Sequence, residues 1–242
     1  MDGNFKTYNY VSSAARIDSI LALPAGSFEE VDDLPDRDKL TYGNGFYGCC
    51  SAVFVDIRDS SKLPEKFKRP PLAKIYRAFI SEMVAVLNSD VYVREVNIVG
   101  DCVWATYRTP TKPCIDDVFS IAFTANTLVK LLNKKLDQAG YGSPISVGIG
   151  IEYGRALMIK AGYSGSGISD VVYMGDVVNR AAHLAAMGSK GWDTPAMMIG
   201  DTFHQNLNEH NRSLLTRDWS RGCYTGNVVL TEMNDWIGAT FN

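Results

Sequence analysis

Apolar residues recur with two different periods along the middle of the chain. The run CCSAVFVDI at residues 49–57 is rich in β-branched residues and predicts a buried strand that ends at Asp56. Large apolar residues then recur at helical spacing through residues 70–87, behind two prolines that suit the first turn of a helix. We therefore expect a strand followed by an amphipathic helix that packs one face on a sheet.

The strand and helix patterns continue in a regular order. Residues 91–99 and 103–108 predict two strands joined by a tight Gly-Asp hairpin. A second amphipathic helix is expected over residues 118–136, and residues 145–151 show the period of a half-buried strand. The order strand, helix, strand, strand, helix, strand predicts an α+β fold with a ferredoxin-like βαββαβ core.

Both ends of the chain add to this core. Residues 1–45 predict an N-terminal extension, with a short helix around residues 12–23 and an acidic, turn-rich surface segment after it. Residues 46–242 contain no linker or repeat and predict one domain. Further elements that extend the antiparallel sheet are expected as a strand at 170–174, a helix at 176–187, a strand at 196–200 and a strand pair around 221–231.

The composition narrows the class of protein. The 242 residues are 46% hydrophobic and 21% charged, which is typical of a folded domain. Lysine and arginine number 24 against 27 acidic residues, so the net charge of -3 gives no general attraction to nucleic acid or anionic membranes. The N-terminus lacks a signal-peptide pattern, and no apolar stretch reaches about 18 residues, so we expect a soluble, cytoplasmic protein. The five cysteines lack paired spacing and predict reduced core residues.

Two aspartates stand where predicted strands end or turn. Asp56 closes the first buried strand, and Asp101 lies in the predicted hairpin. Because the central strands of a ferredoxin-like sheet are neighbours, both carboxylates are expected to converge at one edge. A carboxylate pair together with substrate phosphates suits Mg²⁺ or Mn²⁺, which prefer oxygen ligands. Each aspartate alone has the alternative interpretation of a strand-end or turn residue.

The segments around these aspartates, together with two later segments, resemble the class III adenylate and guanylate cyclases. The four segments occur in the family's order and spacing over residues 49–187: VFVDIRDS, NIVGDCVW, SVGIGIEYGRA and VYMGDVVNRAAHL. The resemblance implies that residues 46–242 are a catalytic domain that closes a nucleoside triphosphate into a 3′,5′-cyclic monophosphate and releases pyrophosphate. It also implies a homodimer whose active sites lie at the subunit interface.

The resemblance implies roles for residues of these segments. Asp56, Asp101 and the backbone carbonyl of Ile57 would hold two Mn²⁺ or Mg²⁺ ions, which activate the ribose 3′-hydroxyl and screen the triphosphate. Arg155 would grip the terminal phosphates through its bidentate donors, and Asn179 would orient the ribose. An arginine after a strand is otherwise a solvated surface residue.

Several positions depart from the family. His183 stands where the family has an arginine that stabilises the transition state, one helical turn after the ribose asparagine. Asn97 and Val172 replace the base-reading lysine and acidic residue of adenylate cyclases. Asp59 and Ser60 make the loop that faces the phosphates more polar. The base pocket is therefore expected to read neither adenine nor guanine in the family's usual way.

This sequence keeps the metal-binding aspartates but has a changed base pocket. In this combination it resembles the bacterial Pycsar cyclases, which make cyclic UMP or cyclic CMP in response to phage. We therefore predict a uridylate or cytidylate cyclase that makes a second messenger in anti-phage defence. Asn97 can satisfy the edge of either uracil or cytosine, and we favour UTP. Two alternatives stay open: a purine cyclase with atypical base contacts, and a catalytically degenerate nucleotide-binding module, which His183 favours.

Overall fold

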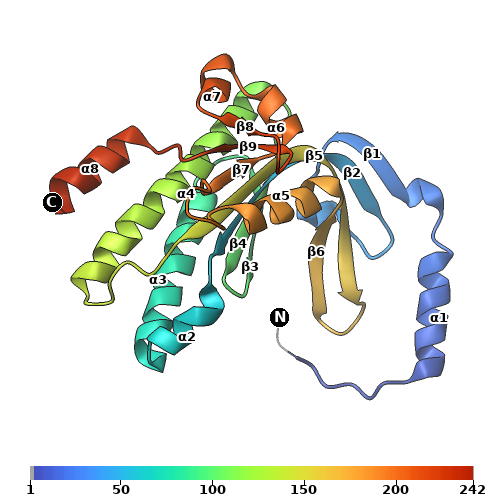
Figure 1. Ribbon diagram of the computed structural model, residues 1–242. Coiled ribbons are helices and arrows are strands. Elements are labelled where there is room, and N and C mark those ends of the chain that lie inside the picture. Colours follow the sequence, from blue (N-terminus) through green and yellow to red (C-terminus); the bar gives the residue numbers. More distant parts are fainter. Residues whose placement is uncertain (1–2, 242) are drawn as a thin grey trace.

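A computed structural model describes residues 3–241 of the chain (Figure 1). Among these residues, one nine-stranded sheet is present, and its strands are β1 (Phe28–Asp33), β2 (Gly45–Ile57), β3 (Val93–Val99), β4 (Cys102–Tyr107), β5 (Val147–Tyr163), β6 (Ile168–Met174), β7 (Met197–Ile199), β8 (Thr216–Asp218) and β9 (Cys223–Gly226). The α-helices are α1 (Tyr10–Leu21), α2 (Leu63–Lys66), α3 (Arg69–Leu87), α4 (Lys112–Gln138), α5 (Asp176–Met187), α6 (Asp201–Asn206), α7 (Glu209–Ser213) and α8 (Thr231–Phe241). Short 3-10 turns are η1 (Ala25–Ser27), η2 (Arg37–Lys39) and η3 (Ser60–Lys62).

The strand order confirms the predicted ferredoxin-like core. The sheet runs β3-β4-β2-β5-β7-β9-β8, with β1 beside β2 and β6 beside β5. The units β2, α3, β3, β4, α4 and β5 follow one another along the chain. Neighbouring strands are antiparallel except in the β1–β2 and β5–β7 pairs. The fold is therefore α+β with a mostly antiparallel sheet.

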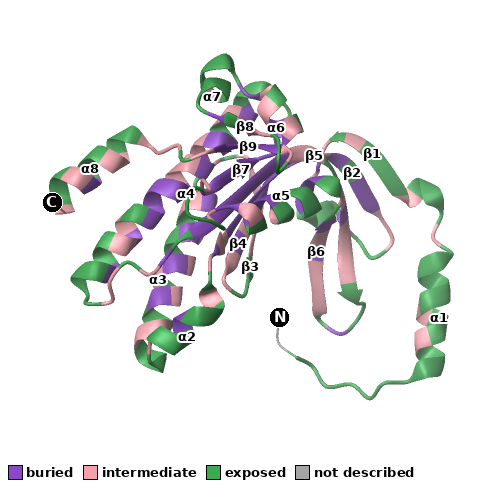
Figure 2. Ribbon diagram, viewed as in Figure 1, coloured by how far each residue is buried: buried purple, intermediate pink, exposed green. Residues whose placement is uncertain are grey.

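Helices cover both faces of this sheet. Helices α3 and α4 lie over one face and α5 lies over the other (Figure 1). Along β2, Val53 and Val55 belong to the larger core under α3 and α4, whereas Ala52 and Phe54 belong to the smaller core under α5. Figure 2 shows the buried residues concentrated along these central strands. We call the side of the sheet that carries Phe54 the α5 face.

Glycine is required where α5 crosses β5. A Cβ at Gly148 would stand 2.0 Å from the carbonyl oxygen of Ala185, and a Cβ at Gly150 would stand 2.0 Å from the carbonyl oxygen of Ala181. Because both obstacles are backbone atoms, the helix itself would have to move. These two glycines therefore set how closely α5 approaches the sheet.

Helix α1 and strand β1 belong to the predicted N-terminal extension. The expected short helix is present as α1, none of whose residues is buried. The acidic segment is exposed over much of its length, as expected, yet it also contains β1, which pairs in parallel with the start of β2. Its run of charges hid the strand, because β1 has little of the apolar alternation by which strands are recognised.

The C-terminal region differs from the expectation. Of the strand pair expected around residues 221–231, β9 lies within that range and its partner β8 lies before it, and residues 231–241 form α8. The side chain of Asp218 accepts hydrogen bonds from the backbone N–H groups of Ser220 and Arg221, which fixes the hairpin turn at that point. The strand pair is therefore present, but the expected placement was wrong for its first strand, β8.

The helices and the cysteines of the described residues bear on two expectations from composition. None of the helices within residues 3–241 is both long and apolar enough to cross a lipid bilayer. All five cysteines are free; Cys50, Cys114 and Cys223 are buried, as expected of core residues, whereas Cys49 and Cys102 are partly exposed.

Replacing Gly150 with alanine tests the contact between α5 and β5. We expect Gly150→Ala to lower the free energy of unfolding by about 1–3 kcal/mol, because the new methyl group overlaps backbone. Gly154→Ala is the matched control in the same strand, since its Cβ would meet only the Cβ of Val177, at 3.5 Å. Urea unfolding of both variants measures the difference. Equal stability of the two variants would contradict the close approach.

Candidate active site

The carboxylates of Asp56 and Asp101 lie close together at one end of the α5 face. The antiparallel register of β2 and β4 places Asp56 opposite Cys102, and Asp101 is the preceding residue, in the β3–β4 turn. Both residues are partly buried. The pKa of Asp56 is raised, mainly by burial; Arg58 lowers it, and the nearby charge of Asp101 raises it further. The pair is therefore a site where a positive charge is stabilised.

Arg58 supplies a positive charge to this pair from within the chain. Its guanidinium forms an ion pair with Asp56 and donates a hydrogen bond to the carbonyl oxygen of Ala186, 3.0 Å away near the end of α5. The Arg58 side chain is only 14% exposed. Sequence reasoning did not single out this residue, although it lies two positions after Asp56. Arg58 thus links the acidic pair to the helix that carries Asn179.

The donor set at this end of the sheet fits a hard divalent cation. Asp56 and Asp101 offer carboxylate oxygens, and the carbonyl of Ile57 lies at the same strand end. Across residues 3–241, no group of three or more His, Cys, Asp or Glu side chains is arranged to hold a metal ion. An ion bound here would therefore complete its shell with phosphate oxygens and water, which is the usual arrangement for Mg²⁺.

The turn at Asp59 and Ser60 is at least partly exposed. Asp59 adopts a left-handed conformation, with φ 53°, and its carboxylate lies 3.0 Å from Lys62 Nζ. Ser60 begins η3, and its backbone carbonyl oxygen accepts a hydrogen bond from the hydroxyl of Tyr76 at 3.3 Å. The two polar residues predicted to face phosphate thus lie close to Asp56 in sequence, on an accessible turn.

An aromatic pair lies beside the acidic pair on the α5 face. The rings of Phe54 and Trp104 stack with centroids 4.8 Å apart and planes 2° apart. Asn97 on β3 is directly opposite Trp104, so its side chain is on the same face. Its Nδ2 atom is buried and has no hydrogen-bond partner within the described part of the chain. Asn97 therefore has an unused donor at the position predicted to read a base.

Val172, the other predicted base-reading residue, lies on β6. It is partly buried and pairs with Ile159 of β5. An arginine of the N-terminal extension, Arg37, connects its strand to that of Asn97, because Arg37 forms ion pairs with residues of both β3 and β6. Arg37 thus joins β3, which carries Asn97, to β6, which carries Val172, within one chain.

Arg155 lies away from the aspartates in a single chain. It is opposite Cys49 on β2, seven residues before Asp56, which is ~23 Å along an extended strand. Its guanidinium lies 4.2 Å from the ring centroid of Tyr47 and 3.1 Å from the carboxylate of Glu30. The role of Arg155 at phosphate stays a prediction.

Asn179 and His183 lie on the outer surface of α5. Both are exposed, whereas the neighbouring Val178, Ala181 and Leu184 are buried. The four-residue spacing puts the two side chains on one helical face. This face points away from the sheet of its own chain, so these residues are available to a molecule outside it.

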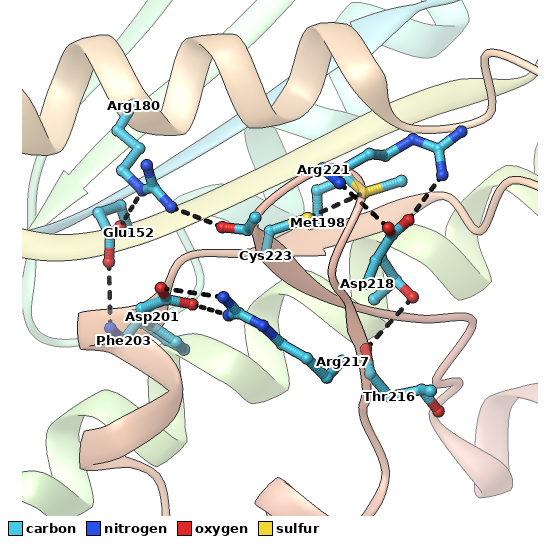
Figure 3. A network of polar contacts seen from close by, with 12 residues as sticks. Glu152, Arg180, Met198, Asp201, Phe203, Thr216, Arg217, Asp218, Arg221 and Cys223 are labelled. Atoms are coloured by element: carbon cyan, nitrogen blue, oxygen red, sulfur yellow. Dashed lines mark hydrogen bonds and ion pairs between the residues drawn. The ribbon is translucent and has the colours of Figure 1, made fainter.

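A polar network fixes α5 in this orientation (Figure 3). Arg180 Nε lies 2.9 Å from the carboxylate of Glu152 on β5, and its Nη2 donates to the carbonyl oxygen of Gly222 at 2.8 Å. The same carboxylate accepts the backbone N–H of Phe203 in α6, at 3.0 Å. Glu152 is almost fully buried, and burial raises its pKa despite these donors. The network ties α5 to the C-terminal elements.

Comparisons with known proteins agree with this fold. Residues 44–218 match the sequence profile of the adenylate and guanylate cyclase catalytic domain. The chain therefore belongs to the class III nucleotide cyclase family and is a nucleotide cyclase. Class III cyclase domains generally use divalent metal ions and are generally dimeric.

Two relatives cover nearly the whole chain. A uridylate cyclase from Gulbenkiania mobilis is 37% identical, with 98% of both chains covered. A uridylate cyclase from Treponema porcinum is 36% identical over 95% of this chain and 81% of its own.

Solved structures share the fold at lower identity. The adenylyl cyclase CyaB from P. aeruginosa has a TM-score of 0.60 at 19% identity and covers 72% of this chain and 85% of its own. A class III adenylyl cyclase-like ATP-binding protein from Pseudomonas aeruginosa has a TM-score of 0.72 at 18% identity, over 92% of this chain and 48% of its own. These similarities show the fold.

The buried carboxylate of Glu152 makes stability depend on pH. The folded-state pKa of Glu152 lies above the ordinary value of 4.5. Between these two pKa values the folded chain binds more protons than the unfolded chain, so the folded state loses stability as the pH rises. We expect the stability of the wild type relative to Glu152→Gln to fall as the pH rises above 4.5 and through the raised folded-state pKa. Thermal melting across this range measures it, with exposed Glu82→Gln as the control. A relative stability that grows with pH would mean that the ion pair with Arg180 outweighs burial.

Proposed function

We propose that this chain converts UTP into 3′,5′-cyclic UMP and pyrophosphate. The observation that carries the proposal is the likeness, at 36% or more identity over at least 95% of the chain, to two uridylate cyclases. The residues at the base-reading positions agree, because Asn97 and Val172 lack the lysine and carboxylate that adenine requires. Asn97 also has an unpartnered buried donor.

The reaction is an intramolecular displacement at phosphorus. The ribose 3′-oxygen forms a bond to the α-phosphorus while the bond from that phosphorus to the bridging oxygen of the β-phosphate breaks, and the hydroxyl proton passes to solvent. Two Mg²⁺ or Mn²⁺ ions held by Asp56, Asp101 and the Ile57 carbonyl would acidify the hydroxyl and neutralise charge on the leaving pyrophosphate. Positioning and charge stabilisation supply the rate enhancement, and no covalent intermediate is needed.

Other side chains position the substrate in this proposal. Asn179 orients the ribose, His183 donates a hydrogen bond to the α-phosphate, and Arg155 binds the terminal phosphates. Asp59 and Ser60 line the loop beside the phosphates. The outward direction of Asn179 and His183 supports a homodimer in which one subunit supplies the metal ligands and the other supplies these two residues. The role in phage defence, in the cytoplasm, is part of the same proposal.

Product analysis with each nucleotide tests the activity. We expect purified protein with Mn²⁺ to form cyclic UMP from UTP at least about tenfold faster than the corresponding products from CTP, ATP or GTP, because a mispaired buried polar group costs about 1–3 kcal/mol. Mass spectrometry identifies each product. Asp56→Ala should abolish the product, whereas Asp137→Asn, at an exposed position of α4, should not.

The other outcomes are equally informative. Preference for CTP would support the cyclase activity but show that the base is cytosine. Preference for a purine nucleotide would contradict the role of Asn97 and Val172. Tight nucleotide binding with no cyclic product from any of the four would contradict the activity. It would favour a catalytically degenerate module in which His183 is the first residue to which the loss of activity is attributed.

A further inference from the structure

An arginine of the N-terminal extension clamps β3 to β6. Arg37 Nη1 lies 2.9 Å from Glu95 Oε1, and Arg37 Nη2 lies 3.6 Å from Asp170 Oδ1. The side chain of Glu95 is 9% exposed, against 46% for Asp170, so Glu95 is the buried end of the clamp. Glu95 precedes Asn97 by two residues and Asp170 precedes Val172 by two. Each carboxylate therefore shares a strand face with a base-reading position.

Glu95 and Asn97 each leave a buried polar atom without a partner. Glu95 Oε2 and Asn97 Nδ2 are buried, and neither has a hydrogen-bond partner within residues 3–241. Glu95 is opposite Thr106 and Asn97 is opposite Trp104, so both side chains are on the α5 face. An orphaned buried polar atom is costly and marks a place where a ligand can complete the hydrogen bonding. Here the two atoms form a neighbouring acceptor and donor.

Uracil offers the complementary pair of groups. Its N3–H is a donor, and the neighbouring carbonyl at position 4 is an acceptor. Cytosine has the reverse order, with an acceptor at N3 and an amino donor at position 4. An ionised carboxylate only accepts hydrogen bonds, whereas an amide nitrogen only donates. A carboxylate at N3 and an amide nitrogen at position 4 therefore match uracil at both atoms and cytosine at neither.

We propose that Glu95 is a specificity-determining residue that accepts the N3–H of uracil while Asn97 donates to the carbonyl at position 4, and that Arg37 positions Glu95. This inference rests on the proposed function, because it assigns the base contacts of the same nucleotide site. It also gives the N-terminal extension a part in substrate selection.

Arg37 also favours the form of Glu95 that selects uracil. Burial raises the pKa of Glu95, Arg37 lowers it, and Asp170 raises it. A protonated Glu95 would present a donor as well as an acceptor, and it would no longer discriminate against the N3 acceptor of cytosine. Loss of Arg37 removes both the positive charge and the 2.9 Å contact that orients the carboxylate.

The direct test is Glu95→Gln, which keeps the size of the side chain and adds a donor. We expect kcat/KM for UTP to fall about 10- to 100-fold and the ratio of UTP to CTP use to fall at least about tenfold. Glu82→Gln, at an exposed glutamate of α3, should leave both values unchanged. An unchanged ratio in a folded Glu95→Gln, checked by melting temperature, would overturn the inference.

Arg37→Gln is the second variant, because the Arg37 side chain is 59% exposed and its replacement leaves the core intact. A positioning role predicts that KM for UTP rises about 3- to 10-fold while kcat stays within about twofold, since only ground-state base binding is weakened. An unchanged KM for UTP would overturn this part. Absence of cyclic UMP from the wild type would instead refute the proposed function, so the two failures are distinguishable.

Discussion

The antiparallel pairing of β2 with β4 sets the position of nearly every chemical group on the α5 face. Its register places Asp56 opposite Cys102 and Phe54 opposite Trp104, so the acidic pair and the aromatic pair are neighbours. A slip of one residue would turn Asp56 toward the large core and Val55 away from it. The full burial of Val53 and Val55 opposes such a slip, because exposing either side chain costs about 1.5–3 kcal/mol.

A second constraint is the close contact of α5 with β5. Gly148 and Gly150 let the helix lie directly on the strand, and Arg180 ties it to Glu152. The inner surface of α5 is thereby buried against the sheet, and only residues on its outer surface can contact a ligand or another chain. This division explains why Asn179 and His183 face away from their own chain, and it is the physical reason for proposing an active site shared by two copies.

Short-range sequence patterns predicted the order of the core elements and the position of the two aspartates. The βαββαβ core, the bounds of α5 and the approach of Asp56 to Asp101 follow from apolar periodicity and from the rules for neighbouring strands. The bridge from Arg37 to Glu95 could not be predicted, because it joins residues 58 positions apart and charged side chains carry no period. The alternation in β3 did place Glu95 on the face of Asn97, and that signal was overlooked.

The central claim is that each active site combines Asp56 of one copy with Asn179 of the other. Co-expression of Asp56→Ala with Asn179→Ala, each inactive alone, tests it most directly. Random pairing gives half heterodimers, each with one intact site of two, so the mixture should recover about a quarter of wild-type specific activity. Recovery no greater than the sum of the two variants alone would mean that one chain supplies both residues, and would contradict the account.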